Sequence, residues 1–216
     1  MSLFLALSKD RVYYIAKAFA PVAKLFGLRV YKHVSYKAYD VPQAVYIANH
    51  QNNYDLFTFS HVVPHSTVTV GKSTLKWIPF FGWLYWATGN FLIHRNDRSK
   101  AIATIAQIVE QMRDTGLSIW MFPEGTRSRG RGFLPFKRGA FHAAIQSGVP
   151  IIPVVCSSTH HQVKLNRLNN GRVKVEVMDP IYTKGMTEKD IPELVAHCEA
   201  LMKAKQTELD EALNLL

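Results

Sequence analysis

The sequence lacks most of the signals that mark small secreted proteins and the common classes of small enzymes. It has only two cysteines, Cys156 and Cys198, too few for a disulfide framework and without CxxC spacing for zinc or redox chemistry. This cysteine usage fits a reducing, cytosol-facing location. The motifs GxSxG, HExxH, GxxxxGK and GxGxxG are absent, which argues against a serine hydrolase, a zinc hydrolase and a nucleotide-binding enzyme. We expect no metal and no cofactor.

Charged residues are also scarce, and most of them are basic. Asp, Glu, Lys and Arg make up only 19% of the 216 residues, yet the formal net charge is +10. A protein of this charge binds nucleic acid, an anionic membrane or a phosphorylated substrate, and charge alone does not distinguish these partners. The apolar content of 48% is enough for one sizeable core.

Long hydrophobic runs are missing near the N-terminus. No run there reaches the roughly 20 apolar residues of a membrane-spanning helix, and no cleavable secretory signal is recognisable. Residues 1–38 are predicted to form a basic amphipathic helical segment, kinked or broken at Pro21. Apolar residues recur in it at helical spacing: Val12, Ile15, Phe19, Val22 and Phe26. Both an interfacial helix on an anionic membrane surface and an ordinary core-packing helix fit this pattern.

An uncharged aromatic stretch, WIPFFGWLYWATGNFLI, spans residues 77–93. Pro79, Gly82 and Gly89 argue against a clean spanning helix. The composition is typical of a bilayer interface or the mouth of an acyl-chain channel. A buried core segment fits it equally well.

Short β-rich runs alternate with helical patterns over the rest of the chain. Strands are predicted at residues 45–48, 67–70, 117–122, 151–155 and 173–178, and helices at 99–113, 138–147 and 191–213. This alternation predicts a single α/β domain over residues 39–216, with a largely parallel central sheet flanked by helices.

A histidine and a carboxylate stand five positions apart at the end of the first of these strands. They belong to the segment NHQNNYD, residues 49–55. On a straight helix His50 and Asp55 would diverge by about 140°, so they can meet only where the strand bends into a helix. An Asp55 that accepts from one ring nitrogen leaves the other free to take a proton from an alcohol. We predict His50 as general base and Asp55 as its orienting group, although a random HxxxxD is more often a capping or core pair.

A second polar group, FPEGTRSRGRG, follows the predicted strand 117–122. Glu124, Gly125, Thr126 and Arg127 place a carboxylate, a flexible backbone, a hydroxyl and a planar cation within four residues. This grouping suits a phosphorylated polyol, because guanidinium groups bind phosphate bidentately and glycine allows close approach of the backbone. A solvated basic loop is the alternative.

Two further cations flank the aromatic stretch. Arg95 ends its apolar run, and Lys72 lies just upstream. Each fits a phosphate ligand or a residue whose charged end reaches the membrane interface. We predict both as substrate-binding residues.

Together these motifs resemble the glycerolipid acyltransferase family, and most closely its bacterial 1-acyl-sn-glycerol-3-phosphate acyltransferases. Four blocks occur in the order of that family: NHQNNYD at 49–55, GNFLIHR at 89–95, FPEGTRSRG at 122–130 and VPIIPV at 149–154. The likeness is strong over residues 45–155. Four ordered blocks are far more specific than any one of them.

The resemblance implies a catalytic dyad of His50 and Asp55, with Arg95, Glu124, Gly125 and Arg127 binding the glycerol-phosphate headgroup. It implies an acyl-CoA or acyl-carrier-protein donor, lysophosphatidic acid as acceptor, phosphatidic acid as product, and association with the cytoplasmic face of the inner membrane. His94 stands where close relatives often have an acidic residue, which puts the hydrogen bonding around Arg95 in doubt. The longer hydrophobic N-terminal segment of some relatives is not seen.

Two alternatives stay open at this stage. The same chemistry fits glycerol-3-phosphate or another lysolipid as acceptor. A non-enzymatic basic protein that binds nucleic acid or membrane would explain the charge but not the motifs. We favour the enzyme, with direct acyl transfer and no nucleic-acid partner, because no convincing nucleophile for an acyl-enzyme is present.

Overall fold

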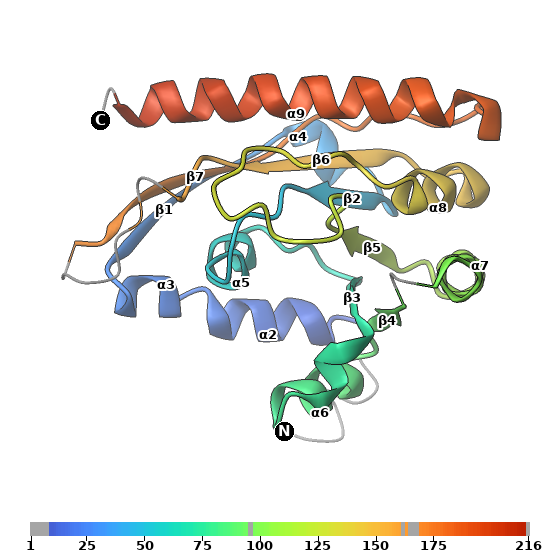
Figure 1. Ribbon diagram of the computed structural model, residues 1–216, viewed down its shortest axis with the longest axis horizontal. Coiled ribbons are helices and arrows are strands. Elements are labelled where there is room, and N and C mark those ends of the chain that lie inside the picture. Colours follow the sequence, from blue (N-terminus) through green and yellow to red (C-terminus); the bar gives the residue numbers. More distant parts are fainter. Residues whose placement is uncertain (1–8, 95–96, 161–162, 164–168, 215–216) are drawn as a thin grey trace.

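Three layers make up the fold in the computed structural model, which describes residues 9–94, 97–160, 163 and 169–214 (Figure 1). The central sheet has seven strands in the order β1-β7-β6-β2-β5-β3-β4. They are β1 (Leu28–Val34), β2 (Val45–Ala48), β3 (Thr67–Lys72), β4 (Phe91–Ile93), β5 (Ser118–Met121), β6 (Ile151–Cys156) and β7 (Gly171–Val177). Neighbouring strands are parallel except for β6 and β7. This confirms the predicted α/β domain with a largely parallel sheet.

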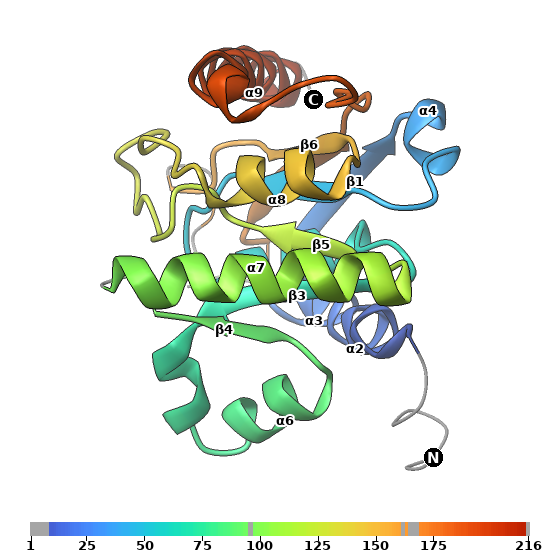
Figure 2. The same cartoon turned by 90° about the vertical axis from the view of Figure 1, so that its right-hand side faces the viewer.

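Helices cover both faces of the sheet (Figures 1 and 2). One face packs against α7 (Arg98–Thr115), α8 (Gly139–Ser147) and α9 (Ile191–Asn214), and the other against α3 (Val22–Leu25) and the single turn α5 (Asp55–Thr58). Helix α2 (Arg11–Phe19) contacts α3, α5 and β3, and its Val12 belongs to the core under α7, α8 and α9. Five short elements complete the described chain: α4 (Tyr36–Tyr39), α6 (Phe81–Ala87), η1 (Phe59–His61), η2 (Ser73–Trp77) and η3 (Glu188–Asp190).

The central strand β2 shows how the sheet separates two cores. Val45 and Ile47 contact the core under α7, α8 and α9, whereas Tyr46 and Ala48 contact the core on the opposite face. Successive side chains of a strand point to opposite faces, so a strand covered on both sides is apolar throughout. All four residues of β2 are buried, which fixes the position of the polar segment that follows them.

The helical prediction for residues 1–38 is wrong over residues 28–34, which form a strand, and its first eight residues lie outside the described part of the chain. The chain forms two short helices that separate at Pro21, then turns at Gly27, whose φ of 63° is a left-handed conformation that favours glycine. β1 follows and pairs in parallel with β7 along its whole length. Residues 28–34 therefore belong to the central sheet. The division at residue 38 between a membrane-associating segment and an acyltransferase domain stays a prediction.

The uncharged aromatic stretch at 77–93 forms the crossover from β3 to β4. It contains the end of η2, the two-turn helix α6 and the three-residue strand β4. The sequence pattern did not predict β4. In the described part of the chain, no helix combines the length and the apolar character needed to cross a bilayer.

Candidate active site

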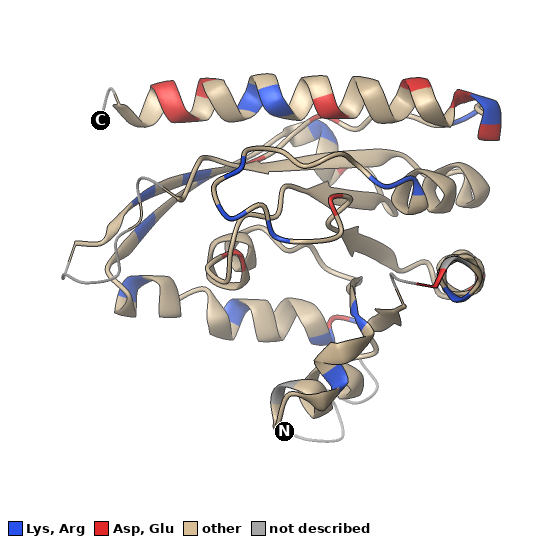
Figure 3. Ribbon diagram, in the orientation of Figure 1, with Lys and Arg blue, Asp and Glu red and all other residues tan. Residues whose placement is uncertain are grey.

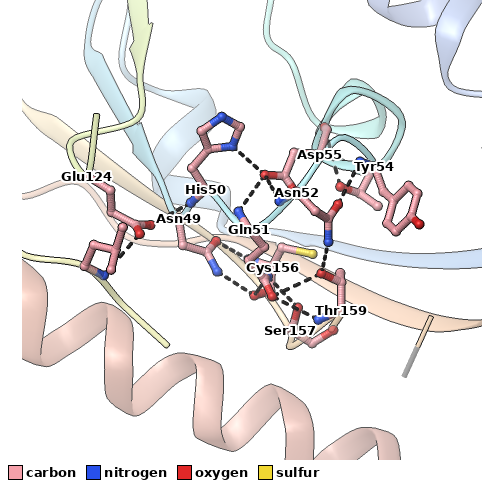
Figure 4. Close-up of polar contacts among 12 residues, drawn as sticks. Asn49, His50, Gln51, Asn52, Tyr54, Asp55, Glu124, Cys156, Ser157 and Thr159 are labelled. Carbon is pink, nitrogen blue, oxygen red and sulfur yellow. Dashed lines mark hydrogen bonds and ion pairs between the residues drawn. The ribbon is translucent and has the colours of Figure 1, made fainter. Parts of the chain in front are cut away.

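His50 and Asp55 meet at the end of β2, as the spacing predicts (Figure 4). The chain leaves β2 after Ala48 and enters α5 at Asp55, so the pair lies across the loop that joins a strand to a helix. His50 Nδ1 lies 2.6 Å from Asp55 Oδ2, and the side chains are 16% and 2% exposed. A hydrogen bond at Nδ1 directs Nε2 away from Asp55, where it can accept a proton.

Three donors converge on one oxygen of Asp55. Besides the imidazole, the backbone N–H groups of Gln51 and Asn52 donate to Oδ2, at 2.7 and 3.2 Å. The Asn52 side chain in turn accepts from the N–H of Tyr54, which shapes the turn that brings Asp55 back toward His50. Asp55 therefore has a fixed position and holds the imidazole in one orientation.

The buried amides of this motif attach the loop to the end of β6 (Figure 4). Asn49 Nδ2 donates to the carbonyl of Cys156 at 2.8 Å, and the N–H of Cys156 donates to Asn49 Oδ1 at 2.9 Å. Gln51 Nε2 donates to the carbonyl of Ser157, and its Oε1 accepts from the N–H of Thr159. Sequence analysis assigned these amides no role, although two buried polar residues at a strand end are a signal for such anchoring.

Glu124 links the histidine loop to the loop that follows β5. Its Oε1 accepts from the N–H of His50 at 2.7 Å, and its Oε2 accepts from the N–H of Leu134 at 3.1 Å. The residue is only 3% exposed. Burial raises the pKa of this carboxyl to about 7, against the opposing effect of the two backbone donors. The loop also donates to the histidine loop, from the N–H of Ser128 to the carbonyl of His50 at 2.8 Å.

An apolar pocket opens next to Phe122, the ring that stacks on the imidazole of His50. The ring of Phe122 stacks on His50 with centroids 4.2 Å apart, and Phe122 also lines the pocket. The remaining lining is mostly apolar and comes from β3, β4, β5 and the start of α8: Val70, Ile93, Met121, Pro123, Gly125, Lys137, Gly139 and Ala140. Sequence analysis missed Phe122 and Lys137, for which the only signal was their place in or near the third motif.

Of the described residues predicted to bind substrate, Gly125 alone lines this pocket. Gly125, at φ 71°, lines it and leaves room for the Lys137 side chain, whose Cε would lie 3.0 Å from an added Cβ. Lys72 is exposed at the end of β3. Thr126 is exposed, and Arg95 lies outside the described residues.

Arg127 has a buried donor that is not used within the described chain. Its Nε is inaccessible to solvent and has no hydrogen-bond partner there. A buried guanidinium nitrogen without a partner costs free energy, which an anionic ligand would recover. Arg131 supports this loop from the side by donating to the carbonyls of Ser128 and Arg127.

A family model for acyltransferases matches residues 29–157. The match includes the dyad, the pocket and both loops described above. This chain belongs to the acyltransferase family.

Curated relatives agree with this assignment. The chain is 53% identical to the 1-acyl-sn-glycerol-3-phosphate acyltransferase of Haemophilus influenzae, over 92% of this chain and 83% of that protein. It is 56% identical to the enzyme of the same name from Escherichia coli K12, over 89% of this chain and 79% of that protein. The family identified from the four sequence blocks is therefore confirmed, and the chain is an acyltransferase.

A solved structure shares the fold. The crystal structure of the 1-acyl-sn-glycerophosphate (LPA) acyltransferase PlsC from Thermotoga maritima superposes with a TM-score of 0.72 at 25% sequence identity, covering 96% of this chain and 86% of that one. The mixed α/β architecture around a mostly parallel sheet is thus that of this acyltransferase.

Proposed function

We propose that this chain transfers a fatty acyl group from acyl-CoA or acyl-carrier protein to the sn-2 hydroxyl of lysophosphatidic acid, and so makes phosphatidic acid for phospholipid biosynthesis. The hydrogen bond of 2.6 Å between His50 and Asp55, next to an apolar pocket, carries the proposal. The names of the relatives support the same acceptor. A non-enzymatic basic protein would have no use for an oriented imidazole at this position.

In the proposed reaction, Nε2 of His50 removes the proton from the acceptor hydroxyl. The oxygen attacks the thioester carbonyl and forms a tetrahedral intermediate. When the C–S bond breaks, the thiolate leaves and takes the proton from the imidazolium, so the enzyme returns to its starting state. Backbone N–H groups or Lys72 stabilise the oxyanion, a contribution of roughly 10² to 10³ in rate for one donor.

The acceptor headgroup is proposed to bind at the loop after β5. The Nε of Arg127, which has no hydrogen-bond partner among the described residues, supports a phosphate ligand there. Arg95, Gly125 and Thr126 are proposed to complete the site. Glu124 would also bind the headgroup. Its two oxygens each accept from a backbone N–H, so it holds the loop in place as well.

The apolar pocket suits the acyl chain of the donor. Its lining beside Phe122 would desolvate a hydrocarbon chain whose thioester end lies close to His50. Because both substrates carry acyl chains, we place the protein at the cytoplasmic face of the inner membrane. The net charge of +10 favours an anionic surface.

An acceptor screen tests this proposal. Purified protein is given one isotope-labelled acyl thioester with lysophosphatidic acid, glycerol-3-phosphate or another lysolipid, and the products are identified by mass. Labelled phosphatidic acid is expected as the main product. A product from glycerol-3-phosphate alone would move the assignment to the alternative acceptor, and no labelled lipid with any acceptor would contradict acyl transfer.

A further inference from the structure

Four large aromatic side chains project into solvent from the crossover between β3 and β4. Trp77, Phe80, Trp83 and Trp86 are 76%, 91%, 71% and 70% exposed. Their spacing of three residues puts Trp83 and Trp86 on one side of α6, Phe80 directly precedes that helix, and Trp77 ends the adjoining η2. We call these four residues the aromatic platform. A soluble surface rarely gathers so much exposed aromatic area without a binding partner.

The inner side of α6 is attached firmly to the sheet. Tyr85 Oη lies 2.7 Å from Thr69 Oγ1 of β3, and Asn90 Oδ1 accepts from both the N–H and the hydroxyl of Thr69. Gly82 packs so closely on η2 that an added Cβ would lie 2.4 Å from the carbonyl oxygen of Lys76. The platform therefore has a fixed orientation relative to β3 and is not a loose loop.

The surroundings of the platform are basic. Helices α2 and α6 and the turn η2 contain no Asp or Glu, and α2 and η2 carry Arg11, Lys17 and Lys76 (Figure 3). Asp10 stands just before α2 and accepts from the N–H of Ser66. Lys76 Nζ lies 4.9 Å from the ring centroid of Trp77. Arg11 ties α2 to α6 by donating to the carbonyl of Ala87 at 3.0 Å. Aromatic residues beside lysines complement the headgroup region of an anionic bilayer.

Phe80 adds an independent indication. Its φ of 60° lies in the region that favours glycine, and its ring is the most exposed of the four. A phenylalanine that gains little from packing and adopts a strained backbone contributes nothing evident to folding. Such outliers point to a function outside the fold.

We propose that the aromatic platform is the surface by which the protein docks on anionic lipid bilayers. The platform lies in the connection whose flanking strands supply Val70 and Ile93 to the pocket beside His50. Docking there would bring a lipid acyl chain directly from the bilayer to the pocket. The inference rests on the proposed function in that the substrates are lipids.

Flotation with vesicles of phosphatidylglycerol and phosphatidylethanolamine tests the platform. The variant Trp77→Ser/Trp83→Ser/Trp86→Ser is expected to partition at least about tenfold more weakly than the wild type. Tyr182→Ser is the matched control, because Tyr182 is also exposed but lies outside the platform, just after β7 and before η3. Equal flotation of the triple variant and the wild type would overturn the proposal.

Two further measurements separate docking from catalysis and from folding. On a short-chain acceptor below its micellar concentration, the triple variant should retain wild-type transfer, whereas His50→Ala should lose transfer but still float. Absence of acyl transfer by the wild type, together with flotation as expected, would contradict the proposed function but not the docking proposal. If light scattering instead shows a dimer that the triple variant breaks, without a change in flotation, the platform binds a second copy and the proposal fails.

Phe80→Gly gives the sharpest test. Glycine relieves the backbone strain, so this variant should melt at the wild-type temperature or above it, while its partition into vesicles falls by roughly three- to tenfold. Weaker docking by a protein that is no less stable cannot be attributed to unfolding. If Phe80→Gly partitions into vesicles like the wild type, Phe80 takes no part in docking. The triple variant then decides whether the three tryptophans dock the protein.

Discussion

The His50 ring is held in one orientation, because its Nδ1 bonds to Asp55 and its face stacks on Phe122. Removal of the imidazole by His50→Ala is expected to lower acyl transfer by roughly 10² to 10⁴, the usual contribution of a general base. Rates with labelled thioester and thermal melting of the same preparation would measure this. A well-folded His50→Ala protein that keeps most of its activity would contradict the mechanism.

Arg127 is expected to affect one substrate more than the other. Its guanidinium group should bind the acceptor phosphate, so Arg127→Ala is expected to raise KM for the acceptor by roughly tenfold or more, with a smaller change in KM for the thioester. Steady-state kinetics with each substrate varied in turn would show this difference. Equal changes for both substrates would remove the proposed role of Arg127.

Glu124 should make stability depend on pH. Its pKa is raised from an ordinary 4.5 to about 7, so the folded protein binds a proton more tightly than the unfolded chain does. The stability from this group is complete below about pH 4.5 and is lost as the pH rises through about 7, on the order of 3 kcal/mol in total. Urea unfolding of wild type and Glu124→Gln between pH 5 and pH 8 should give curves whose difference changes over this window. A constant difference would show that Glu124 does not titrate there.

At the scale of elements, α6 depends on the absence of a side chain at Gly82. An added methyl group would press on the backbone of η2, so Gly82→Ala should destabilise this contact by about 1–3 kcal/mol. Hydrogen exchange is expected to become faster across residues 73–93 and to stay unchanged in β2. Unchanged exchange in α6 would mean that η2 shifts at little cost.

The two strands that the sequence did not reveal are both edge strands. β1 has the sequence LRVYKHV, and only Leu28 is fully buried, because neighbouring strands and helices cover little of it. The helical spacing of apolar residues up to Phe26 therefore predicts a helix that extends into this strand. Gly27 is the one local signal that the helix ends. β4 has only three residues, too few for any periodicity. Central strands were predicted because burial on both faces leaves a continuous apolar run.

The candidate site divides in the same way between local and distant contacts. The pairing of His50 with Asp55 is local, so residue spacing and the bend after a strand were enough to predict it. The hydrogen bonds between Glu124 and the His50 backbone and between Gln51 and Ser157 depend on β2 lying between β5 and β6. That strand order cannot be derived from residue spacing along one chain.

For the molecule as a whole, the uneven distribution of charge should make membrane binding sensitive to salt. Basic residues near an anionic surface contribute about 1 kcal/mol each, and this attraction is screened over about 10 Å at 0.1 M salt. Reversal of charge in Lys17→Glu/Lys24→Glu should weaken flotation on phosphatidylglycerol vesicles and reduce its salt dependence. Flotation that is equally strong on purely zwitterionic vesicles would show that hydrophobic contact alone holds the protein.

The parallel pairing of β1 with β7 also has a consequence for biosynthesis. Leu28 lies opposite Gly171 and Val34 opposite Val177, so the first strand to leave the ribosome has its partner among the last. The strands between them can associate earlier, because β2, β3 and β5 pair with one another within the first two thirds of the chain. During translation the nascent protein therefore carries an open strand edge, with the basic helices α2 and α3 just ahead of it, until β7 has been made.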